Sequence, residues 1–319
     1  MIVFRDPSEV PADFGPSVVA IGKFDGVHSG HRAVLARARV DAATSGARVV
    51  AVTFDRNPLA LLRPEVCPED LIGVHQKLQL LAETGIDATL LLRFDRQLAN
   101  LTAREFVERM LVDALGVRTV LVGGDFRFGR GGAGNPDMLR ELGDEFGFDV
   151  DVVDDVRAIE AGRRVSSTWI RELLAEGDVE GAAKLLGRHA SVWGEVVHGL
   201  KRGRELGFPT ANLSPDLEGF VPADGVYAGW LVDQGSADGL RRGERYPAAI
   251  SVGVNPTFDD VRVRQVEAYV LDETDLELYG RDVEIQFVSR IRGMVAFEGV
   301  DALIEQITDD VRRVRDVLA

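Results

Sequence analysis

The segment at residues 22–31, which reads GKFDGVHSGH, constrains the fold more than any other part of this chain. The apolar run SVVAI at residues 17–21 precedes it, and a helical pattern that starts at His31 follows it. We therefore expect a buried strand, a glycine-bearing loop and a helix N-terminus in succession. Unpaired backbone N–H groups and the positive end of the helix dipole then point the same way, so this loop is predicted to bind an anion such as a phosphate.

The glycines and histidines of this segment suggest how it would act. Gly22, Gly26 and Gly30 can adopt positive φ and allow a ligand to approach the backbone closely. His28 and His31 are three residues apart, so both rings can lie on one face and donate to the same phosphate group. The segment has no nucleophile with a neighbouring base, which favours electrostatic stabilisation of a phosphoryl group.

Three other interpretations of the segment stay open on these residues alone. The histidines could bind a metal, although the chain has only five His and none of the others stands at a usual zinc spacing from this pair. They could be ordinary residues of a strand-to-helix turn. They could also form the His-x-Gly-His of an aminoacylation site.

Composition limits the class of protein. A chain of 319 residues with 45% apolar residues is expected to form two packed domains. Its net charge of −15 disfavours nucleic acid and anionic lipid as partners. The single Cys67 fits a reducing compartment, and neither a signal peptide nor an apolar run of membrane-spanning length is present, so we expect a cytoplasmic protein.

The first part of the chain alternates strand and helix signals. Strands are predicted at residues 17–21, 48–54, 88–92, 117–122 and 148–153. Between them, Thr102 and Glu105 form a capping-box pattern, and Asn135 followed by Pro136 is typical of a helix start. This alternation predicts a doubly wound, Rossmann-like parallel sheet with helices on both faces and a ligand at the carboxyl ends of the strands.

Two further segments of this part have candidate binding residues. Residues 123–129, GGDFRFG, follow a predicted strand and place two aromatic rings in a loop. The overlapping GRGGAG matches G-x-G-x-x-G but does not open a helix directly after a strand, so we discount it as a dinucleotide fingerprint. Residues 165–171, VSSTWIR, fit either an ordinary N-cap or, with Arg171, a phosphate clamp.

The second part of the chain has a different pattern. After a helix at residues 178–186 that Gly187 ends, strands are predicted at residues 191–198, 225–232, 247–252, 264–270 and 282–289. They indicate a small antiparallel β-barrel, and residues 300–318 repeat apolar side chains at helical spacing against it. We therefore expect two domains, residues 1–186 and 187–319.

Residues 199–213, GLKRGRELGFPTANL, are the most distinctive segment of this second part. The glycines and basic residues alone would fit a charged connection on a barrel. Thr210 and Asn212, however, can point two neutral oxygens the same way in an extended segment, which suits Mg²⁺ already held by substrate phosphates. The chain has no P-loop motif, so a P-loop kinase is not expected.

In their order along nearly the whole chain, these motifs resemble the prokaryotic bifunctional riboflavin kinase/FAD synthetases. GKFDGVHSGH resembles the signature of the nucleotidyltransferase module, DFRFG its flavin and nucleotide pocket, and VSSTWIR the family's ISSTxIR motif. GRELGFPTANL, residues 203–213, matches the riboflavin kinase signature, and GVYA and NPTF match family motifs that we interpret as pocket walls.

The resemblance implies two reactions, phosphorylation of riboflavin to FMN and adenylylation of FMN to FAD, with ATP as substrate and Mg²⁺ as cofactor. It implies that His28, His31 and Glu267 are catalytic, with Glu267 as the base that accepts the proton of the riboflavin hydroxyl. The remaining predicted site residues are as follows: for ATP in adenylyl transfer Gly22, Phe24, Asp25, Gly26, Gly30, Ser166, Ser167, Thr168 and Arg171; for the flavin Asp125 and Phe128; for ATP in the kinase Gly203, Gly207, Phe208, Pro209, Thr210 and Asn212; and for the metal Thr210 and Asn212.

This chain departs from the family pattern at two positions. Relatives have Pro-His-Pro or similar where Arg56, Asn57 and Pro58 stand here, so we assign no site role to these residues. Tyr269 stands where relatives have His after Val-Glu-Ala. Two other functions remain as alternatives, a non-catalytic flavin carrier and a nucleotidyltransferase that acts on another phosphorylated substrate.

Overall fold

The computed structural model describes residues 1–153, 162–198, 207–234, 243–254, 264–273, 277–295, 297 and 299–319. The chain divides into two compact units, Met1–Ser166 and Ser167–Ala319. The helices at residues 167–186, which we assigned to the first domain, belong to the second unit in this division. The functional boundary near Gly187 stays a prediction.

The first unit is built on a six-stranded sheet in the order β1-β4-β3-β2-β5-β6, and every neighbouring pair is parallel. The strands are β1 (Ile2–Phe4), β2 (Ser17–Ile21), β3 (Arg48–Phe54), β4 (Ala88–Leu92), β5 (Val117–Gly123) and β6 (Asp149–Val153). All five predicted strands are confirmed. The short β1 was missed because three residues give too little periodicity to distinguish a strand from a loop.

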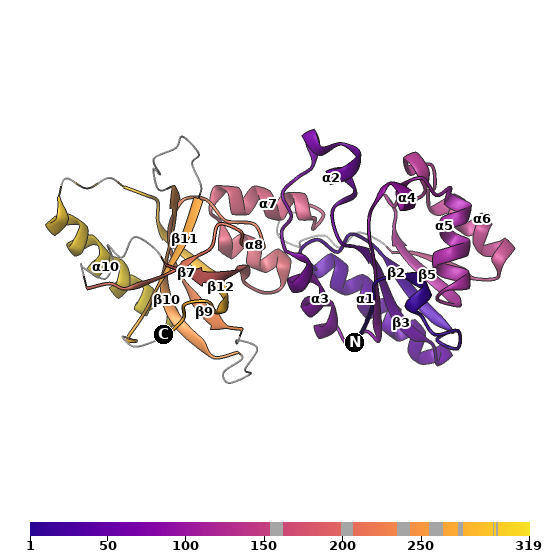
Figure 1. Ribbon diagram of the computed structural model, residues 1–319, viewed down its shortest axis with the longest axis horizontal. Coiled ribbons are helices and arrows are strands. Elements are labelled where there is room, and N and C mark those ends of the chain that lie inside the picture. The colour runs from indigo at the N-terminus through magenta and orange to yellow at the C-terminus, as the bar shows by residue number, and fades with distance from the viewer. Residues whose placement is uncertain are drawn as a thin grey trace. The chain divides into compact units, whose positions relative to one another are not determined.

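Helices cover both faces of this sheet, with α1 and α3 on one side and α5 and α6 on the other (Figure 1). The helices are η1 (Pro7–Glu9), α1 (Ser29–Ser45), α2 (Pro58–Leu62), η2 (Pro64–Val66), α3 (Val74–Glu83), α4 (Arg96–Ala99), α5 (Ala103–Phe106), η3 (Val107–Asp113), η4 (Arg130–Gly132) and α6 (Pro136–Phe146). The predicted caps are present: Thr102 and Glu105 form the capping box of α5, and Asn135 accepts a hydrogen bond from the Met138 backbone at the start of α6. The doubly wound prediction is therefore confirmed.

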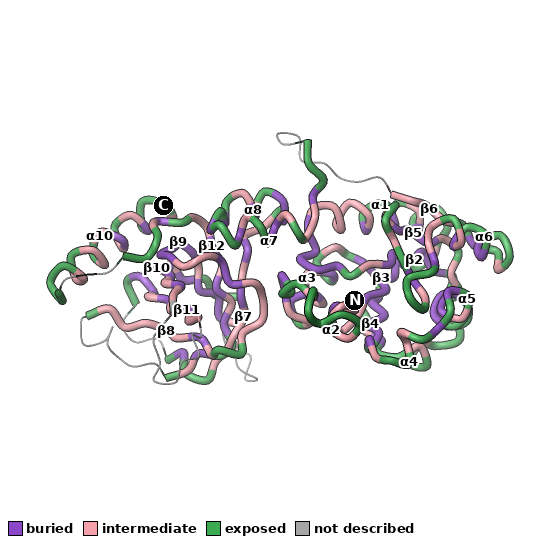
Figure 2. The backbone as a smooth tube through the Cα atoms, turned by 90° about the horizontal axis from the view of Figure 1, so that it is seen from above, coloured by how far each residue is buried: buried purple, intermediate pink, exposed green. Residues whose placement is uncertain are grey.

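The order of the strands locates the ligand crevice. From β2 the chain adds β3 and β4 on one side and then crosses to add β5 and β6 on the other. A doubly wound sheet binds ligands where this order reverses, at the carboxyl ends of the strands. The loops after β2 and β5 lie there, and they are the two loops that the sequence singles out. Buried residues concentrate along β2, β3 and β4, so the strands next to this edge form the core of the unit (Figure 2).

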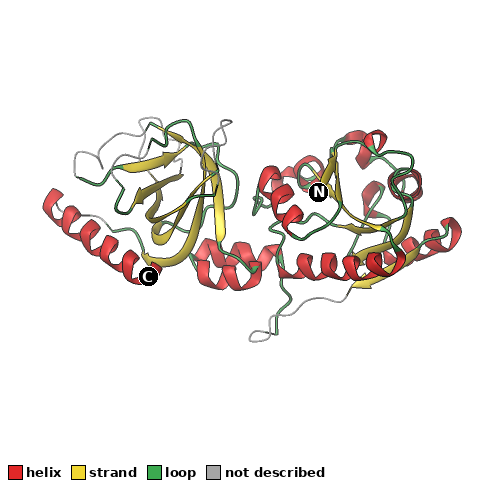
Figure 3. Cartoon of the chain, turned by 90° about the horizontal axis from the view of Figure 1, so that it is seen from below, coloured by secondary structure: helices red, strands yellow, loops and turns green. Residues whose placement is uncertain are grey.

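The second unit is a closed six-stranded barrel in the order β10-β11-β8-β7-β12-β9, and its pairs are antiparallel. Its strands are β7 (Ala190–Val197), β8 (Thr210–Leu213), β9 (Gly225–Asp233), β10 (Arg245–Val254), β11 (Arg264–Val270) and β12 (Asp282–Arg292). The helices α7 (Ser167–Glu176) and α8 (Val179–Leu186) precede the barrel, and α10 (Val300–Leu318) follows it (Figure 3). The predicted antiparallel barrel with a terminal helix is confirmed.

A buried ion pair joins the terminal helix to the barrel. The Asp310 carboxylate of α10 is 3% exposed and lies 2.7 Å from the Arg292 guanidinium of β12. Val314, one turn further along α10, is fully buried against the barrel. The apolar stripe predicted for residues 300–318 therefore packs as expected, with a charged pair inside it.

Candidate active sites

The loop after β2, residues 22–28, has a strained backbone. We call it the first loop. Phe24, Gly26 and Val27 have φ angles of 48°, 83° and 38°. Positive φ is unusual for a bulky or β-branched residue, and such strain persists only where surrounding contacts impose it. The expectation of positive φ was wrong for Gly22 and Gly30, because only Gly26 of the three glycines adopts it.

Buried side chains hold the first loop in this conformation. Phe24 is 2% exposed and Val27 is fully buried, so burial of their side chains offsets the cost of their backbone angles. The Asp25 carboxylate is also buried and accepts a hydrogen bond from the Leu71 backbone N–H at 2.8 Å. Asp25 therefore anchors the loop to the segment before α3, while its predicted contact with ATP stays a prediction.

The two histidines lie together at the start of α1. His28 is the N-cap residue, and its Nδ1 accepts from the His31 backbone N–H over a long 3.4 Å. The two rings stack with centroids 3.7 Å apart and planes 17° apart, so they do lie on one face as predicted. A Cβ on Gly30 would stand 3.1 Å from the His28 ring, so glycine at this position leaves room for the ring to turn back over the helix start.

Burial keeps His31 neutral. Loss of water lowers the pKa of His31 well below 6.5, and positive charge at His28, Lys77 and Arg164 lowers this pKa further. The His31 Nδ1 is buried and has no hydrogen-bond partner among the residues that the structure describes. At neutral pH this pair can therefore offer N–H donors to a phosphoryl group without carrying a charge on His31.

The loop after β5, residues 123–129, presents one charged and one apolar feature. We call it the second loop. The exposed Asp125 carboxylate lies 2.9 Å from the Arg164 guanidinium, and this hydrogen bond lowers the pKa of Asp125. Phe128 is 6% exposed and packs in the core. Its ring stacks on that of the half-buried Phe126, with the ring centroids 5.4 Å apart. The flavin-binding roles of Asp125 and Phe128 stay predictions, and the sequence did not point to Arg164, the ion-pair partner of Asp125.

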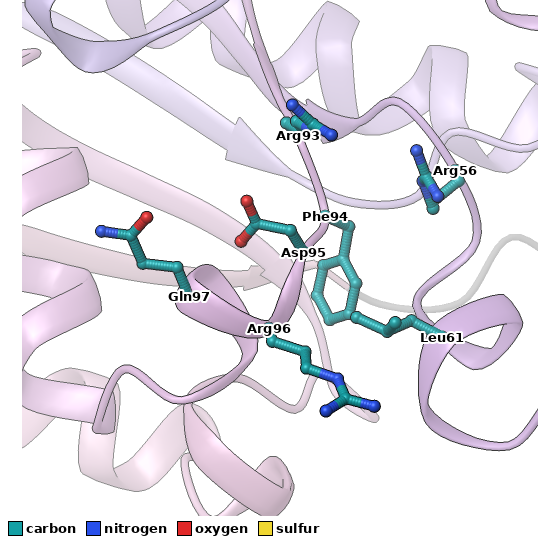
Figure 4. A pocket seen from close by; sticks show the side chains of 7 residues that line it. All are labelled: Arg56, Leu61, Arg93, Phe94, Asp95, Arg96 and Gln97. Carbon is teal, nitrogen blue, oxygen red and sulfur yellow. The ribbon is translucent and has the colours of Figure 1, made fainter.

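The residues at 56–58, which depart from the family pattern, have a structural role. The Asn57 side chain accepts a hydrogen bond from the Leu59 backbone at 3.1 Å, and Pro58 is the first residue of α2. Beside them, at the carboxyl ends of β3 and β4, lies a pocket of about 340 Å³ (Figure 4). Its lining residues are Arg56, Leu61, Arg93, Phe94, Asp95, Arg96 and Gln97.

The predicted phosphate clamp begins as expected at a helix start. Helix α7 begins at Ser167, so Ser166 precedes it and Thr168 lies in its first turn. Ser167, Thr168 and Arg171 belong to the second compact unit. Their role in binding ATP stays a prediction.

In the second unit, strand register brings the predicted kinase residues together. Glu267 of β11 stands directly opposite Asn212 of β8, and Tyr269 stands opposite Thr210. The Asn212 amide nitrogen donates to the Thr210 carbonyl at 3.2 Å and to its hydroxyl oxygen at 3.3 Å. Burial raises the pKa of Glu267, and a hydrogen bond with the Thr210 side chain opposes this rise. Three side chains chosen from two separate motifs therefore form one cluster.

The donor set of this cluster fits Mg²⁺. A hydroxyl, an amide and a carboxylate are all hard oxygen donors, and the Asn212 amide nitrogen is already bonded to Thr210, which leaves the amide oxygen for a cation. No group of three or more His, Cys, Asp or Glu side chains among the described residues could hold a metal by itself. A cation at this cluster would thus depend on nucleotide phosphates for its other ligands, as is usual for Mg²⁺.

The remaining kinase predictions fall around the same strand. Phe208 lies edge-on to the Tyr269 ring at 5.4 Å, so Tyr269 supports the segment that precedes Thr210. Gly207 has a φ of 89° and Pro209 follows Phe208. Gly203 and the predicted pocket wall at residues 255–258 lie outside the described residues.

Comparison with known proteins agrees with this division into two sites. The family model of FAD synthetase matches residues 10–169, and that of riboflavin kinase matches residues 186–318. A bifunctional riboflavin kinase/FMN adenylyltransferase of Escherichia coli K12 is 38% identical over 300 residues, which is 94% of this chain and 92% of the relative. The relative of the same description in Listeria monocytogenes is 36% identical and covers 95% of this chain and 92% of its own length.

A solved structure has a similar fold. The crystal structure of a protein described as a macrolide-efflux protein, from Streptococcus pneumoniae, is 31% identical to this chain. It matches with a TM-score of 0.83 over 98% of each chain. In the part of the chain that the structure describes, no helix has the length and apolar character needed to cross a membrane. From its two family matches and its near full-length relatives, this chain belongs to the family of bifunctional riboflavin kinase/FMN adenylyltransferases.

Proposed function

We propose that this chain makes FAD from riboflavin in two ATP-dependent steps, each at its own site. In the first step, the terminal ribityl oxygen of riboflavin attacks the γ-phosphorus of ATP, the bond to ADP breaks, and FMN forms. In the second step, a phosphate oxygen of FMN attacks the α-phosphorus of a second ATP, and pyrophosphate leaves. Neither step needs a covalent enzyme intermediate.

The first loop and the start of α1 would carry out adenylyl transfer. Backbone N–H groups at the helix start, together with the rings of His28 and His31, would stabilise the charge that develops on the α-phosphoryl group. Because these donors are held by a strained, buried loop, they need little reorganisation during the reaction. The exposed Asp125–Arg164 pair would border the flavin side of this crevice.

The cluster on β8 and β11 would carry out phosphoryl transfer. Glu267, made more basic by its burial, would accept the proton of the riboflavin hydroxyl. Thr210 and Asn212 would hold Mg²⁺ against the nucleotide phosphates, where the cation supplies neutralisation of phosphate charge. The Glu267 carboxylate is oriented for this role by its hydrogen bond with Thr210.

One observation supports the proposal more than any other. The residues that the sequence motifs single out converge in two separate clusters, His28 with His31 in the first unit and Thr210 with Asn212 and Glu267 in the second. A chain with one nucleotide site would have no reason to assemble both. The predicted cytoplasmic location and the absence of nucleic-acid or membrane partners remain parts of the proposal.

The test is a turnover assay with the purified chain, riboflavin, ATP and MgCl₂, followed by chromatographic separation of FMN and FAD. We expect FMN to appear first and FAD to follow, with pyrophosphate released in proportion to FAD. Binding of riboflavin without either product would favour the flavin carrier instead. FMN without FAD, together with adenylylation of a pyridine or pantetheine phosphate, would favour the other nucleotidyltransferase.

A further inference from the structure

A buried lysine lies behind the first loop and has no part in the chemistry described above. Lys77 of α3 is 8% exposed, although its helix has exposed positions available. An ammonium group loses much of its hydration on burial, and lysines are seldom buried without a specific partner. Burial lowers the pKa of Lys77, while the carboxylates of Asp25, Asp70 and Asp55 oppose that change. These carboxylates therefore favour the charged form of Lys77 at its buried position.

The contacts of Lys77 lead to the end of β3, which holds the first loop. The Lys77 Nζ donates to the Phe54 carbonyl at 3.1 Å, at the last residue of the strand. The hydroxyl of Thr53, the residue before Phe54, donates to the Lys23 carbonyl at 3.1 Å. The Gly22 backbone N–H donates to the Val52 carbonyl, also at 3.1 Å. The strand end that Lys77 fixes is therefore hydrogen-bonded directly to the start of the first loop.

A second connection joins the same helix region to the same loop. The Asp25 carboxylate accepts from the Leu71 backbone N–H, three residues before α3 begins at Val74. The first loop is thus fastened to the α3 region on two sides, through Asp25 within the loop and through Lys77 at the strand end. Because Phe24 and Val27 are held in unfavourable backbone conformations, removal of either fastening would let the loop relax and displace the histidines that follow it.

The charge of Lys77 also acts on the catalytic pair. The basic groups whose positive charge would oppose protonation of His31 are His28 at the N-cap of α1, Lys77 on α3, and Arg164 in the segment before α7. Each makes protonation of the His31 ring less favourable, in addition to the effect of burial. Lys77 is buried, as His28 is, so solvent screens its charge less than that of the exposed Arg164.

We propose that Lys77 is a positioning residue for adenylyl transfer: it fixes the strand end that carries the first loop and thereby sets the position of His31. Lys77 does not touch substrate in this scheme. The inference rests on the proposed adenylyltransferase activity. It predicts that loss of the ammonium group lowers the turnover rate for FAD formation far more than it raises the KM for ATP or FMN, because bound substrate remains but the donors are misplaced.

The test is a comparison of Lys77→Met with Leu81→Ala in the full chain. Methionine keeps most of the length of the side chain and removes its charge, whereas Leu81 is fully buried on the same face of α3 one turn later and carries no charge. For Lys77→Met we expect kcat for FAD formation to fall about 100-fold. The pKa of the His31 ring, followed by NMR, should rise in Lys77→Met, because His31 protonates more easily without the neighbouring charge. Leu81→Ala should lower the Tm but leave that pKa unchanged.

Three results would overturn the inference: a Lys77→Met variant with wild-type kcat, a loss of activity with an unchanged His31 pKa, or the same rise of that pKa in Leu81→Ala. If Lys77→Met does not fold, Lys77→Arg takes its place, since it keeps the charge and should keep the His31 pKa of the wild type. A raised His31 pKa in a folded Arg variant would also overturn it. Absence of FAD formation by the wild type would instead contradict the proposed function, so the two failures are distinguishable.

Discussion

The two candidate sites of this chain are built by different structural means. The adenylyltransferase site depends on a loop with three positive φ angles and on a helix N-terminus, and buried side chains such as Phe24 and Asp25 hold it in place. The kinase site depends on the regular pairing of β8 with β11, which sets Glu267 opposite Asn212. Strand register is fixed by many backbone hydrogen bonds, whereas a strained loop depends on a few specific contacts. The first site should therefore be more easily disturbed by changes outside it.

The two sites are alike in how burial adjusts their titratable groups. Burial favours the neutral form of both His31 and Glu267, so the pKa of the histidine falls and the pKa of the carboxylate rises. The consequences are opposite. His31 becomes a donor that stays uncharged at neutral pH, while Glu267 becomes a stronger base than an exposed glutamate.

The largest expected effect is the separation of the two activities at the histidine pair. The double variant His28→Ala/His31→Ala should lower FAD formation from supplied FMN by about 10³-fold or more, because it removes the donors at the α-phosphoryl group. FMN formation from riboflavin should stay at the wild-type rate. Both rates are measured on one preparation by chromatography of the flavins. Loss of both activities in a protein that keeps its Tm would contradict two independent sites.

The reverse separation is expected at the barrel cluster. Glu267→Gln should lower FMN formation by about 10²- to 10⁴-fold, which is the usual contribution of a general base, and should leave FAD formation from supplied FMN unchanged. Gln265→Ala, two residues earlier on the same face of β11, is the matched control and should retain most of the kinase rate. Equal losses in both variants would indicate that the strand, and not the carboxylate, is what matters.

The difference between a site built on strand register and a site built on a strained loop explains how much could be predicted from the sequence. Side chains alternate between the two faces of a strand, so the sequence indicates that Thr210 and Asn212 share one face. That Glu267 lies beside them follows once β8 is paired with β11. The strands of the doubly wound sheet could be predicted equally well, since buried parallel strands give continuous apolar runs such as SVVAI.

The details of the first site could not be predicted from the sequence in this way. Positive φ at Phe24 and Val27 contradicts local preference, and glycine at residue 30 meets a different need, which is the space that the His28 ring occupies. Lys77 and Arg164 reach this site from segments far along the chain. A weak signal for Lys77 was present, because it is four residues from Leu81 and so shares the buried face of α3.

The pH dependence of the two rates should also differ. Glu267 must be ionised to accept a proton, so the kinase rate should fall on acidification through a pKa above 4.5, whereas titration of His31 should leave the rate of adenylyl transfer unchanged until the pH is well below 6.5. The effects on stability have opposite signs. Glu267 contributes to the free energy of unfolding below pH 4.5, and this contribution is lost as the pH rises through its folded-state pKa. His31 contributes above pH 6.5, and its contribution is lost as the pH falls through its own folded-state pKa. Rate profiles of the wild type and unfolding curves of Glu267→Gln and His31→Ala test both statements.

The smallest effect concerns the strain itself, and it tests whether the first site is as dependent on its backbone as the comparison implies. Gly26→Ala places a side chain at a φ of 83°, which should lower the free energy of unfolding by about 1 kcal/mol. Gly46→Ala is its matched control, because Gly46 has a φ of 65° at the end of α1 and a Cβ there would meet nothing within 4 Å. Urea denaturation should show similar losses of stability in the two variants. FAD formation should fall in Gly26→Ala alone, since only that glycine lies in the loop that positions His28 and His31. Equal FAD rates in the two variants would mean that the first loop tolerates local adjustment, and the contrast with the register-built kinase site would then lose its physical basis.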